Sequence, residues 1–244
     1  MPKVTILQPH PTAPVGRLEN WLDECGIDCQ LVDLQCERVP AATDWGDGAV
    51  VLGGKMNALD VEANPWITDL RAELRAAVEH AVPVLAICLG HQILASAFGG
   101  EVVVSHPAGG EHGVFSVVLF QSCANDPVMR SVYCPEATKQ GGKDAAILAY
   151  ESHYDAVVTL PEGANLLAGS QLYPIQAFRI GSALGLQFHP ETTPQIMAAH
   201  RREQGVVGAE FLSGLLAVDA TVVDSARRIA HGFAAQCGGR VPQE

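Results

Sequence analysis

At residues 82–95 the chain reads VPVLAICLGHQILA. The unbroken apolar run Val82–Ile87 is too short for a lone amphipathic helix and is typical of a parallel strand that is covered on both faces. The pattern changes after Cys88, because Gly90 permits tight backbone geometry and the apolar residues beyond it recur at helical spacing. The stretch therefore predicts a buried strand, a sharp turn at Cys88 and a helix.

The predicted turn has chemical consequences for Cys88. A thiol at a helix N-terminus faces unpaired backbone N–H groups and the positive end of the helix dipole, which favour the reactive thiolate. Residues 86–90, AICLG, are the cysteine counterpart of the Gly-x-Ser-x-Gly nucleophile elbow, in which the N–H of Leu89 is a natural oxyanion donor. The stretch alone leaves a second interpretation open, because free cysteine is often buried and Cys88 would also suit a core.

The 244 residues show strand and helix patterns in alternation, with no linker, internal repeat or low-complexity tract. Shorter alternating segments follow the turn at Cys88 and are typical of antiparallel or mixed strands added to a parallel core. We therefore predict one α/β domain over residues 1–244, with a mixed, mostly parallel central sheet flanked by helices. Its core spans about residues 1–203, and a helical extension follows at about residues 204–236.

The periodicity of the apolar residues places the individual elements. Strands are predicted at residues 4–7, 29–34, 48–52, 82–87, 101–104, 114–119, 145–150, 156–160, 166–168, 177–180 and 183–188. Helices are predicted at about residues 15–25 and 65–81, after Cys88, near 127–133 within a surface excursion at 123–143, and two or three times from Thr193 onward. Core-facing positions are predicted at Leu18, Trp21, Leu22, Ile67, Leu70, Leu74, Val78, Val222, Val223, Ala226, Ile229, Ala230 and Phe233.

Net charge and cysteine use argue against several classes of function. The formal charge of −12 offers no electrostatic attraction to nucleic acid or to an anionic membrane. The seven cysteines are scattered without a Cys-x-x-Cys pair, which argues against a disulfide framework or zinc knuckle and favours a reducing cytoplasm. No signal-peptide pattern opens the chain, and no run approaches the roughly 18 apolar residues of a membrane span. We expect a soluble, cytoplasmic protein.

Motifs for cofactors and metals are missing from the sequence. Residues 53–56, GGKM, superficially resemble a phosphate loop, but Met56 stands where that motif needs Ser or Thr and Ala49 where it needs its first glycine. The nine histidines have no ligand spacing for a metal. The pair Gly53-Gly54 is either a plain turn or a source of N–H donors near a carbonyl under attack. We predict no cofactor and no metal.

A second stretch with chemical potential is LGLQFHPE at residues 184–191, which predicts a strand ending in His-Pro-Glu. On an extended backbone, residues two apart point to the same side, so the Glu191 carboxylate can reach the His189 ring. A cysteine, a histidine that accepts and returns its proton, and a carboxylate that fixes the histidine tautomer form a general nucleophilic centre. SHYD at residues 152–155 offers the same His-x-acid spacing. Spacing does not choose between the two, and His189 by itself is typical of an ordinary strand-end histidine.

Together these motifs resemble those of the class I glutamine amidotransferases, of the stand-alone kind similar to the amidotransferase domain of GMP synthase. The likeness runs from about residue 50 to 193. It rests on GGKMN at 53–57, the Pro65-Trp66 helix start, CLGHQ at 88–92, SHYD at 152–155 and QFHPE at 187–191, in the family's order. The resemblance implies a flavodoxin-like fold with a strand-to-helix nucleophile elbow. It also favours His189 over His153 as the catalytic histidine.

The resemblance assigns a role to each matching residue. It implies Cys88 as the nucleophile, His189 as the general base and acid, and Glu191 as the carboxylate that orients His189. The oxyanion hole would be formed by Gly54 and Leu89. The residues that would hold the substrate are Gly53, Gln92, Ser152, His153 and Tyr154.

Two departures from the family pattern are modest. Ala86 stands where many members have glycine, and Lys55 stands where proline is frequent, at the mouth of the site. The elbow should tolerate the first change, and the second would alter the mouth.

The resemblance implies hydrolysis of the glutamine side-chain amide through a γ-glutamyl thioester. The products are glutamate and ammonia, and family members normally pass the ammonia to a synthetase. The sequence has no ATP-binding loop of its own, so a separate acceptor enzyme is one expectation. An autonomous γ-glutamyl peptide hydrolase or transferase is another, and a relative that only binds a ligand is a third. Intact Cys88, His189 and Glu191 argue against the third, and the sequence does not choose between the first two.

Overall fold

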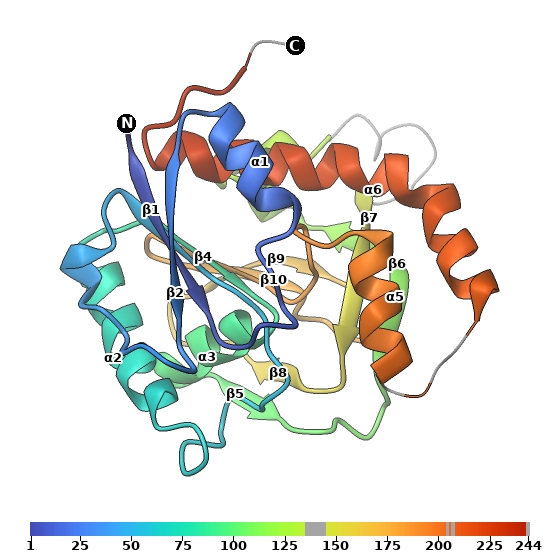
Figure 1. The fold of residues 1–244 in the computed structure, drawn as a ribbon, viewed down its shortest axis with the longest axis horizontal. Helices are drawn as coiled ribbons and strands as arrows, with labels where there is room; N and C mark the ends of the chain where they lie inside the picture. Colours follow the sequence, from blue (N-terminus) through green and yellow to red (C-terminus); the bar gives the residue numbers. More distant parts are fainter. Residues whose placement is uncertain (135–144, 204, 206–207, 243–244) are drawn as a thin grey trace.

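The computed structural model describes residues 1–134, 145–203, 205 and 208–242. Its centre is a sheet in the strand order β2-β1-β3-β4-β11-β10-β9-β6-β7, accompanied by a two-stranded sheet of β5 and β8 (Figure 1). The strands are β1 (Lys3–Gln8), β2 (Asp28–Asp33), β3 (Gly48–Val51), β4 (Val84–Ile87), β5 (Glu101–Val103), β6 (Glu111–Leu119), β7 (Ala146–His153), β8 (Ala156–Thr159), β9 (Asn165–Gly169), β10 (Ala177–Ile180) and β11 (Ala183–Leu186). The helices are α1 (Arg17–Glu24), α2 (Trp66–Glu79), α3 (Leu89–Ala97), α5 (Pro194–Glu203) and α6 (Ala209–Gln236).

The sheet is mixed but mostly parallel, which confirms the predicted fold class. β2, β1, β3, β4 and β11 pair in parallel. The remaining neighbours pair antiparallel, so of the described strands of this sheet only β10 and β6 run against the common direction. All four residues of β4 are buried, as expected of a parallel strand between two helical layers.

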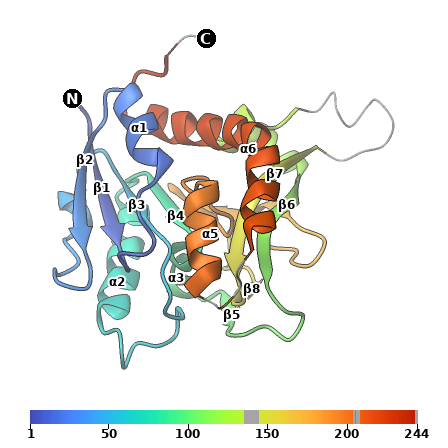
Figure 2. The ribbon, with the colours of Figure 1, turned by 45° about the vertical axis from the view of Figure 1, so that its right-hand side comes forward.

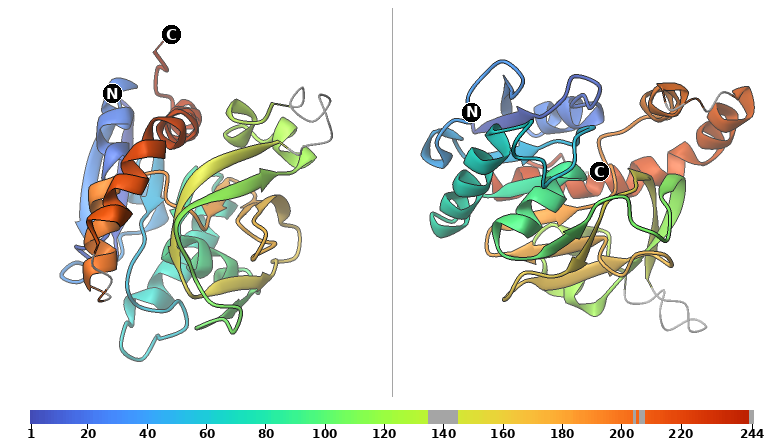
Figure 3. Two further views of the ribbon diagram at one scale, coloured as in Figure 1. Left: turned by 90° about the vertical axis from the view of Figure 1, so that its right-hand side faces the viewer. Right: turned by 90° about the horizontal axis from the view of Figure 1, so that it is seen from below.

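Helices cover both faces of the parallel half (Figures 1 and 3). On one face, Leu18 and Leu22 of α1 share a core with Phe233 of α6. On the other face, α2 and α3 contribute residues such as Leu70 and Ile93 to a second core. Burial of one such side chain stabilises the fold by about 1.5–3 kcal/mol, so the two layers together hold β4 rigidly in the middle.

Several predicted boundaries are wrong by a few residues. β6 begins three residues before the predicted start at Val114, and β7 runs to His153. β11 ends at Leu186 instead of Phe188, although the N–H of Gln187 still donates to the carbonyl of Gln176 beside β10 before the chain turns away. The chain leaves β4 at this point, so His189 lies in a turn beyond the strand.

Smaller differences concern helices and burial. Val78 and Val223 are only partly buried, and Ala77 takes the predicted core position of Val78 in α2. The short helix expected near 127–133 is a single 3-10 turn at Met129–Ser131, and further 3-10 turns lie at Ala42–Asp44 and Gln121–Asn125. The predicted surface excursion is wrong in its first part, because Cys123, Val128 and Met129 are buried. Residues 135–143 of it, and the boundary predicted at residue 204, lie outside the described residues.

The final helix, α6, crosses one side of the molecule and packs against α1, α5 and β7 (Figure 2). Its buried residues are Leu215, Val222, Ala226, Ile229, Ala230, Phe233 and Ala234. No helix in the described part of the chain combines the length and the apolar content that a membrane span requires.

Replacement of Gly90 should test how tightly α3 rests on β3. A Cβ at this position would lie 2.6 Å from the carbonyl oxygen of Val51, so the helix and strand must move apart. We expect Gly90→Ala to lower the free energy of unfolding by about 1–3 kcal/mol in urea titrations. Gly214→Ala in α6 is the matched control, since the new Cβ meets nothing within 4 Å. This substitution should raise the free energy of unfolding by about 0.5–1 kcal/mol, because alanine favours a helix more than glycine does. An unchanged Gly90→Ala protein would contradict the close contact.

Candidate active site

Cys88 joins β4 to α3 at a strained turn. Its φ of 51° lies in the left-handed region, which is uncommon for residues other than glycine. Its N–H donates to the carbonyl of Leu186 at 2.8 Å, and its side chain retains a small exposed fraction of 6%. Backbone strain of this kind persists where the surrounding structure fixes it, and it is concentrated at active sites. The predicted strand, turn and helix are all present.

His189 and Glu191 lie together in the turn that follows β11. The main-chain N–H of His189 donates to the carbonyl of Tyr150 on β7 at 2.8 Å. The side chains meet at 2.7 Å between Nδ1 of His189 and Oε1 of Glu191, and both are buried. Because a carboxylate only accepts hydrogen bonds, Nδ1 carries a proton, and Nε2 is the ring nitrogen left to exchange a proton with Cys88. The two groups therefore meet as expected, although through a turn and not along an extended strand.

The surroundings of His189 favour its protonated form. Burial by itself lowers the pKa of His189, but Glu191 and Cys88 outweigh it, and together they hold this pKa well above its usual value. Cys88 acts both through its charge and through its contact with the ring. An imidazole in such surroundings is suited to take a proton from the neighbouring thiol.

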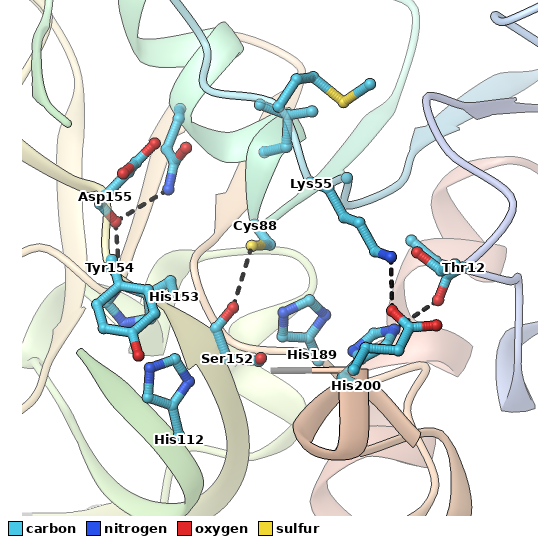
Figure 4. Close-up of a pocket in the computed structure, with 16 residues that line it drawn as sticks. Thr12, Lys55, Cys88, His112, Ser152, His153, Tyr154, Asp155, His189 and His200 are labelled. Atoms are coloured by element: carbon cyan, nitrogen blue, oxygen red, sulfur yellow. Dashed lines mark hydrogen bonds and ion pairs between the residues drawn. The ribbon is translucent and has the colours of Figure 1, made fainter. Parts of the chain in front are cut away.

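A pocket of about 370 Å³ opens above Cys88 (Figure 4). Its walls come from the loops after β1 and β3, the start of α3, the end of β7 and the helix α5. The predicted site residues that line it are Gly54, Cys88, Leu89, Gln92, Ser152, His153, Tyr154 and His189. Glu191 and Gly53 do not line it. Glu191 contacts the ring of His189, and a Cβ on Gly53 would lie 3.3 Å from His189 Cε1 and 3.6 Å from Cys88 Cβ.

The two residues expected to supply the oxyanion donors, Gly54 and Leu89, pack against each other. Leu89 is the first residue of α3, so its N–H has no carbonyl within the helix to which it could donate. A Cβ on Gly54 would come within 2.7 Å of Leu89 Cδ2. The loop after β3 therefore packs directly on the start of α3, and a side chain at position 54 would have to displace the ends of the Leu89 and Met56 side chains.

The residues expected to bind substrate contribute mainly main-chain and amide groups. The carbonyl oxygen of Ser152 lies 4.0 Å from Cys88 Sγ, and Figure 4 shows the two groups facing each other. The Gln92 amide donates to the carbonyl of Asp155 at 3.0 Å and to Gln187 Oε1 at 3.1 Å. Tyr154 is half exposed at the pocket mouth, beside the ring of His112.

The rival histidine, His153, is engaged away from Cys88. Its Nδ1 donates to the carbonyl of Asp155 at 3.0 Å. Its Nε2 lies 3.3 Å from a carboxylate oxygen of Glu111 and 3.5 Å from one of Glu151. The side chain is almost completely buried. The ring of His153 therefore forms part of the buried wall behind the pocket.

Sequence reasoning missed the two carboxyl groups of this wall, Glu111 and Glu151. The described residues contain one group with metal-ligand potential, and it consists of these carboxyls and His153, whose ligand atoms lie within 4.8 Å of one another. Glu111, however, already accepts a hydrogen bond from the Gln176 amide at 2.6 Å. Burial, and next the charge of Glu111, raise the pKa of Glu151 well above its usual value, against an opposing effect of His189. The only signal in the sequence was the position of Glu151, a charged residue directly after the predicted apolar strand 145–150.

Lys55 bridges the mouth of the pocket. Lys55 Nζ lies 2.5 Å from Glu203 Oε2, so the loop after β3 is joined to α5 (Figure 4). Both side chains are about half exposed. Exposed pairs of this kind contribute at most about 1 kcal/mol, so this bridge opens easily.

The chain also matches a known protein family. The family model described as glutamine amidotransferase class-I matches residues 16–208. The chain belongs to the class I glutamine amidotransferases. The match includes every residue predicted for the site, and the amidotransferase is accordingly an amidohydrolase enzyme.

Curated relatives of the amidotransferase are glutamine-hydrolyzing GMP synthases or subunits of them. The GMP synthase subunit from Halobacterium salinarum is 30% identical over 189 residues, which cover 77% of this chain and 86% of that protein. The corresponding subunit from Thermococcus kodakarensis is 36% identical over 115 residues, 46% of this chain and 53% of that one. The GMP synthase of Psychrobacter arcticus is 31% identical over 70% of this chain and 28% of its own length. The amidotransferase thus spans about half or less of several of these relatives.

Solved structures show the same fold. A glutamine amidotransferase from Thermotoga maritima superposes with a TM-score of 0.79 at 22% identity and covers 95% of this chain and 97% of its own. A glutamine amidotransferase from Methylobacillus flagellatus gives a TM-score of 0.78 at 25% identity, with 100% and 97% coverage. Both likenesses extend over α6, beyond the end of the family match.

Titration of Glu151 should make the stability of the amidotransferase depend on pH. The pKa of Glu151 is raised in the folded state, so the folded protein favours the protonated carboxyl. Its contribution to the free energy of unfolding is therefore complete below the unfolded pKa of about 4.3 and is lost as the pH rises through the folded pKa. We expect Glu151→Gln, which is neutral at every pH, to match the parent near pH 4 and to become the more stable protein as the pH rises. Each unit by which folding raises the pKa of Glu151 corresponds to a difference of about 1.4 kcal/mol in the free energy of unfolding.

Urea unfolding at several pH values measures this difference, with Glu162→Gln as a control at an exposed loop position. A constant stability difference between parent and Glu151→Gln from pH 4 to 8 would show that Glu151 is ionised in the folded protein.

Proposed function

We propose that the amidotransferase hydrolyses the side-chain amide of glutamine with Cys88, His189 and Glu191 as its catalytic triad. The observation that carries this proposal is the 2.7 Å hydrogen bond from His189 to Glu191, beside a cysteine at a strand-to-helix turn in the same pocket. The carboxylate fixes the tautomer of the imidazole, which leaves Nε2 available to the thiol. The family membership of the chain supports the same assignment.

The proposed reaction follows the positions of these groups. His189 Nε2 accepts the thiol proton, and Cys88 Sγ attacks the side-chain amide carbon of glutamine. The N–H groups of Leu89 and Gly54 stabilise the negative oxygen of the tetrahedral intermediate. His189 then gives its proton to the departing nitrogen, ammonia leaves, and a γ-glutamyl thioester remains on Cys88. Water, deprotonated by His189, attacks the thioester and releases glutamate, and the proton returns to the thiolate.

The substrate is held, in this proposal, by the end of β7 and the start of α3. The main chain of Ser152 and Tyr154 offers fixed donors and acceptors beside Cys88, and Gln92 is itself held by two hydrogen bonds. Groups held in this way contribute orientation without further loss of entropy. No cofactor or metal enters the proposed reaction.

We further propose that the ammonia serves a separate acceptor enzyme. One relative that is named as a glutamine-hydrolyzing subunit of GMP synthase is matched over 86% of its length, which supports a synthetase as the partner. All seven cysteines are free thiols, in keeping with a reaction in the cytoplasm.

A second candidate, hydrolysis or transfer of a larger γ-glutamyl compound, is favoured by the size of the pocket. Its volume of about 370 Å³ falls in the range of about 300–1,000 Å³ that is typical of sites for drug-sized ligands, and free glutamine has only ten non-hydrogen atoms. The pocket continues past Cys88 to Thr12, His200 and Glu203, where a leaving amine larger than ammonia would fit.

Substitution of the triad separates the two histidines. We expect Cys88→Ala to abolish glutamine hydrolysis and His189→Ala to lower kcat by about 10²–10⁴-fold, the usual contribution of a positioned general base. His153→Ala should cost far less, after correction for its folded fraction. A glutamine-analogue electrophile should form one adduct, on Cys88, by mass spectrometry. A loss below tenfold for His189→Ala, or a larger loss for His153→Ala, would mean that the wrong base has been chosen.

Steady-state kinetics decide between the partner and the autonomous enzyme. If a synthetase normally receives the ammonia, we expect the isolated protein to hydrolyse glutamine slowly and to accelerate when a synthetase is added. An autonomous enzyme would turn over a γ-glutamyl peptide alone, with kcat in the ordinary range of about 1–10³ s⁻¹. Such turnover without any addition refutes the partner proposal. Cys88→Ala serves as the blank in both assays.

A further inference from the structure

The last helix, α6, begins at Ala209, directly beyond the residues 16–208 that the family model matches. That match therefore gives it no role. One of its acidic side chains, Asp219, is nevertheless mostly shielded from solvent, with 22% of its area exposed. α6 packs against both α1 and β7 (Figures 1 and 2), and Asp219 contacts a residue of each.

Asp219 accepts hydrogen bonds from two elements that are far apart in the sequence. The guanidinium of Arg17 donates to its two carboxylate oxygens at 3.0 and 2.7 Å, a bidentate pair. The hydroxyl of Tyr150, whose side chain is completely buried, donates to Oδ1 at 2.8 Å. Burial, and next the bond to Asp219, raise the pKa of Tyr150, so its hydroxyl keeps the proton that it donates.

The same two residues hold the catalytic turn through their main chains. The carbonyl of Tyr150 accepts the N–H of His189 at 2.8 Å, and the N–H of Arg17 donates to the carbonyl of Glu191 at 2.8 Å. The chain before Arg17 approaches Glu191 so closely that a Cβ on Gly16 would lie 2.2 Å from the Glu191 carbonyl oxygen. The two ends of the His-Pro-Glu turn are thus hydrogen-bonded to Tyr150 and Arg17, and the side chains of both residues donate hydrogen bonds to Asp219. We call this closed set, Asp219, Arg17, Tyr150, His189 and Glu191, the Asp219 ring.

We propose that Asp219 is a positioning residue for the catalytic centre. By fixing Tyr150 and Arg17 it sets the main-chain positions of His189 and Glu191, and with them the 2.7 Å contact of their side chains and the approach of the imidazole to Cys88. Packing alone would hold α6 in place with apolar residues, of which it has seven buried. The directed bonds of a shielded carboxylate add a defined geometry. This inference rests on the proposed triad.

The principal test is Asp219→Asn, which keeps the shape of the side chain but removes the charge that pairs with Arg17. A displacement of about 1 Å at a reacting group can cost about 10²-fold in rate, so we expect kcat to fall roughly tenfold to a hundredfold. The KM for glutamine should change less than about threefold, because the pocket-lining residues Gln92 and Ser152 are not members of the ring. Asp224→Asn is the matched control on the same helix, where an exposed aspartate pairs with Arg228. It should leave kcat unchanged.

A milder variant and a second measurement keep the test independent of folding. Tyr150→Phe removes one bond of the ring, and we expect a smaller loss of kcat in the same direction. The double variant with Asp219→Asn should lose less than the product of the two single losses, since both break one ring. Fractions folded are measured by circular dichroism at the assay temperature.

Alkylation of Cys88 by iodoacetamide across a pH series reports on the cysteine and histidine pair without substrate. We expect the pH profile of Asp219→Asn to shift from that of the parent, and that of Asp224→Asn to coincide with it. Equal kcat values for Asp219→Asn and Asp224→Asn, or a loss explained wholly by the unfolded fraction, would overturn the positioning role. Full activity of Cys88→Ala would overturn the proposed triad instead, so the two failures are distinguishable.

Discussion

The contact between α3 and β3 at Gly90 is the constraint on which the site depends. Since residue 90 has no side chain, the helix begins almost on top of the Val51 carbonyl, and Cys88 must turn the chain through a left-handed φ. A residue held in this region costs on the order of 1–3 kcal/mol. The buried strand β4 and the buried face of α3 offset this cost, because each large apolar side chain contributes a similar amount. The thiol therefore stands at a point that the whole core fixes.

Local patterns in the sequence were sufficient to predict the fold class and the elbow. The apolar run before Cys88 and the helical spacing after it are properties of neighbouring residues, and both elements are found with boundaries shifted by two residues or fewer. The motif at the end of β11 also pointed to a contact of His189 with Glu191. Its structural reason was wrong, since the contact arises in a turn that is held by Tyr150 on a different strand.

Features that depend on distant residues could not be predicted. Arg17 and Asp219 are 202 positions apart and meet only because α1 and α6 cover the same face of the sheet. Glu111 and Glu151 lay just outside the predicted strands and looked like ordinary surface residues, because a sequence does not show that a carboxyl group will be buried. Their burial follows from the pairing of β6 with β7, which places Glu111 opposite His153. Contacts between residues far apart in the chain thus account for most of the structural features that could not be predicted.

The position of β11 in the sheet has a consequence for synthesis of the protein. β11 pairs with β4 in register from Val84 to Ile87, although about one hundred residues of chain separate the two strands. At ribosomal speeds of about 5–20 residues per second, β4 therefore waits on the order of ten seconds for this neighbour. During that time the nascent chain presents an apolar strand with an unpaired edge, the kind of surface that other chains join. The strand that carries the nucleophile is also the one that most needs protection, by a chaperone or by rapid translation, before the chain is complete.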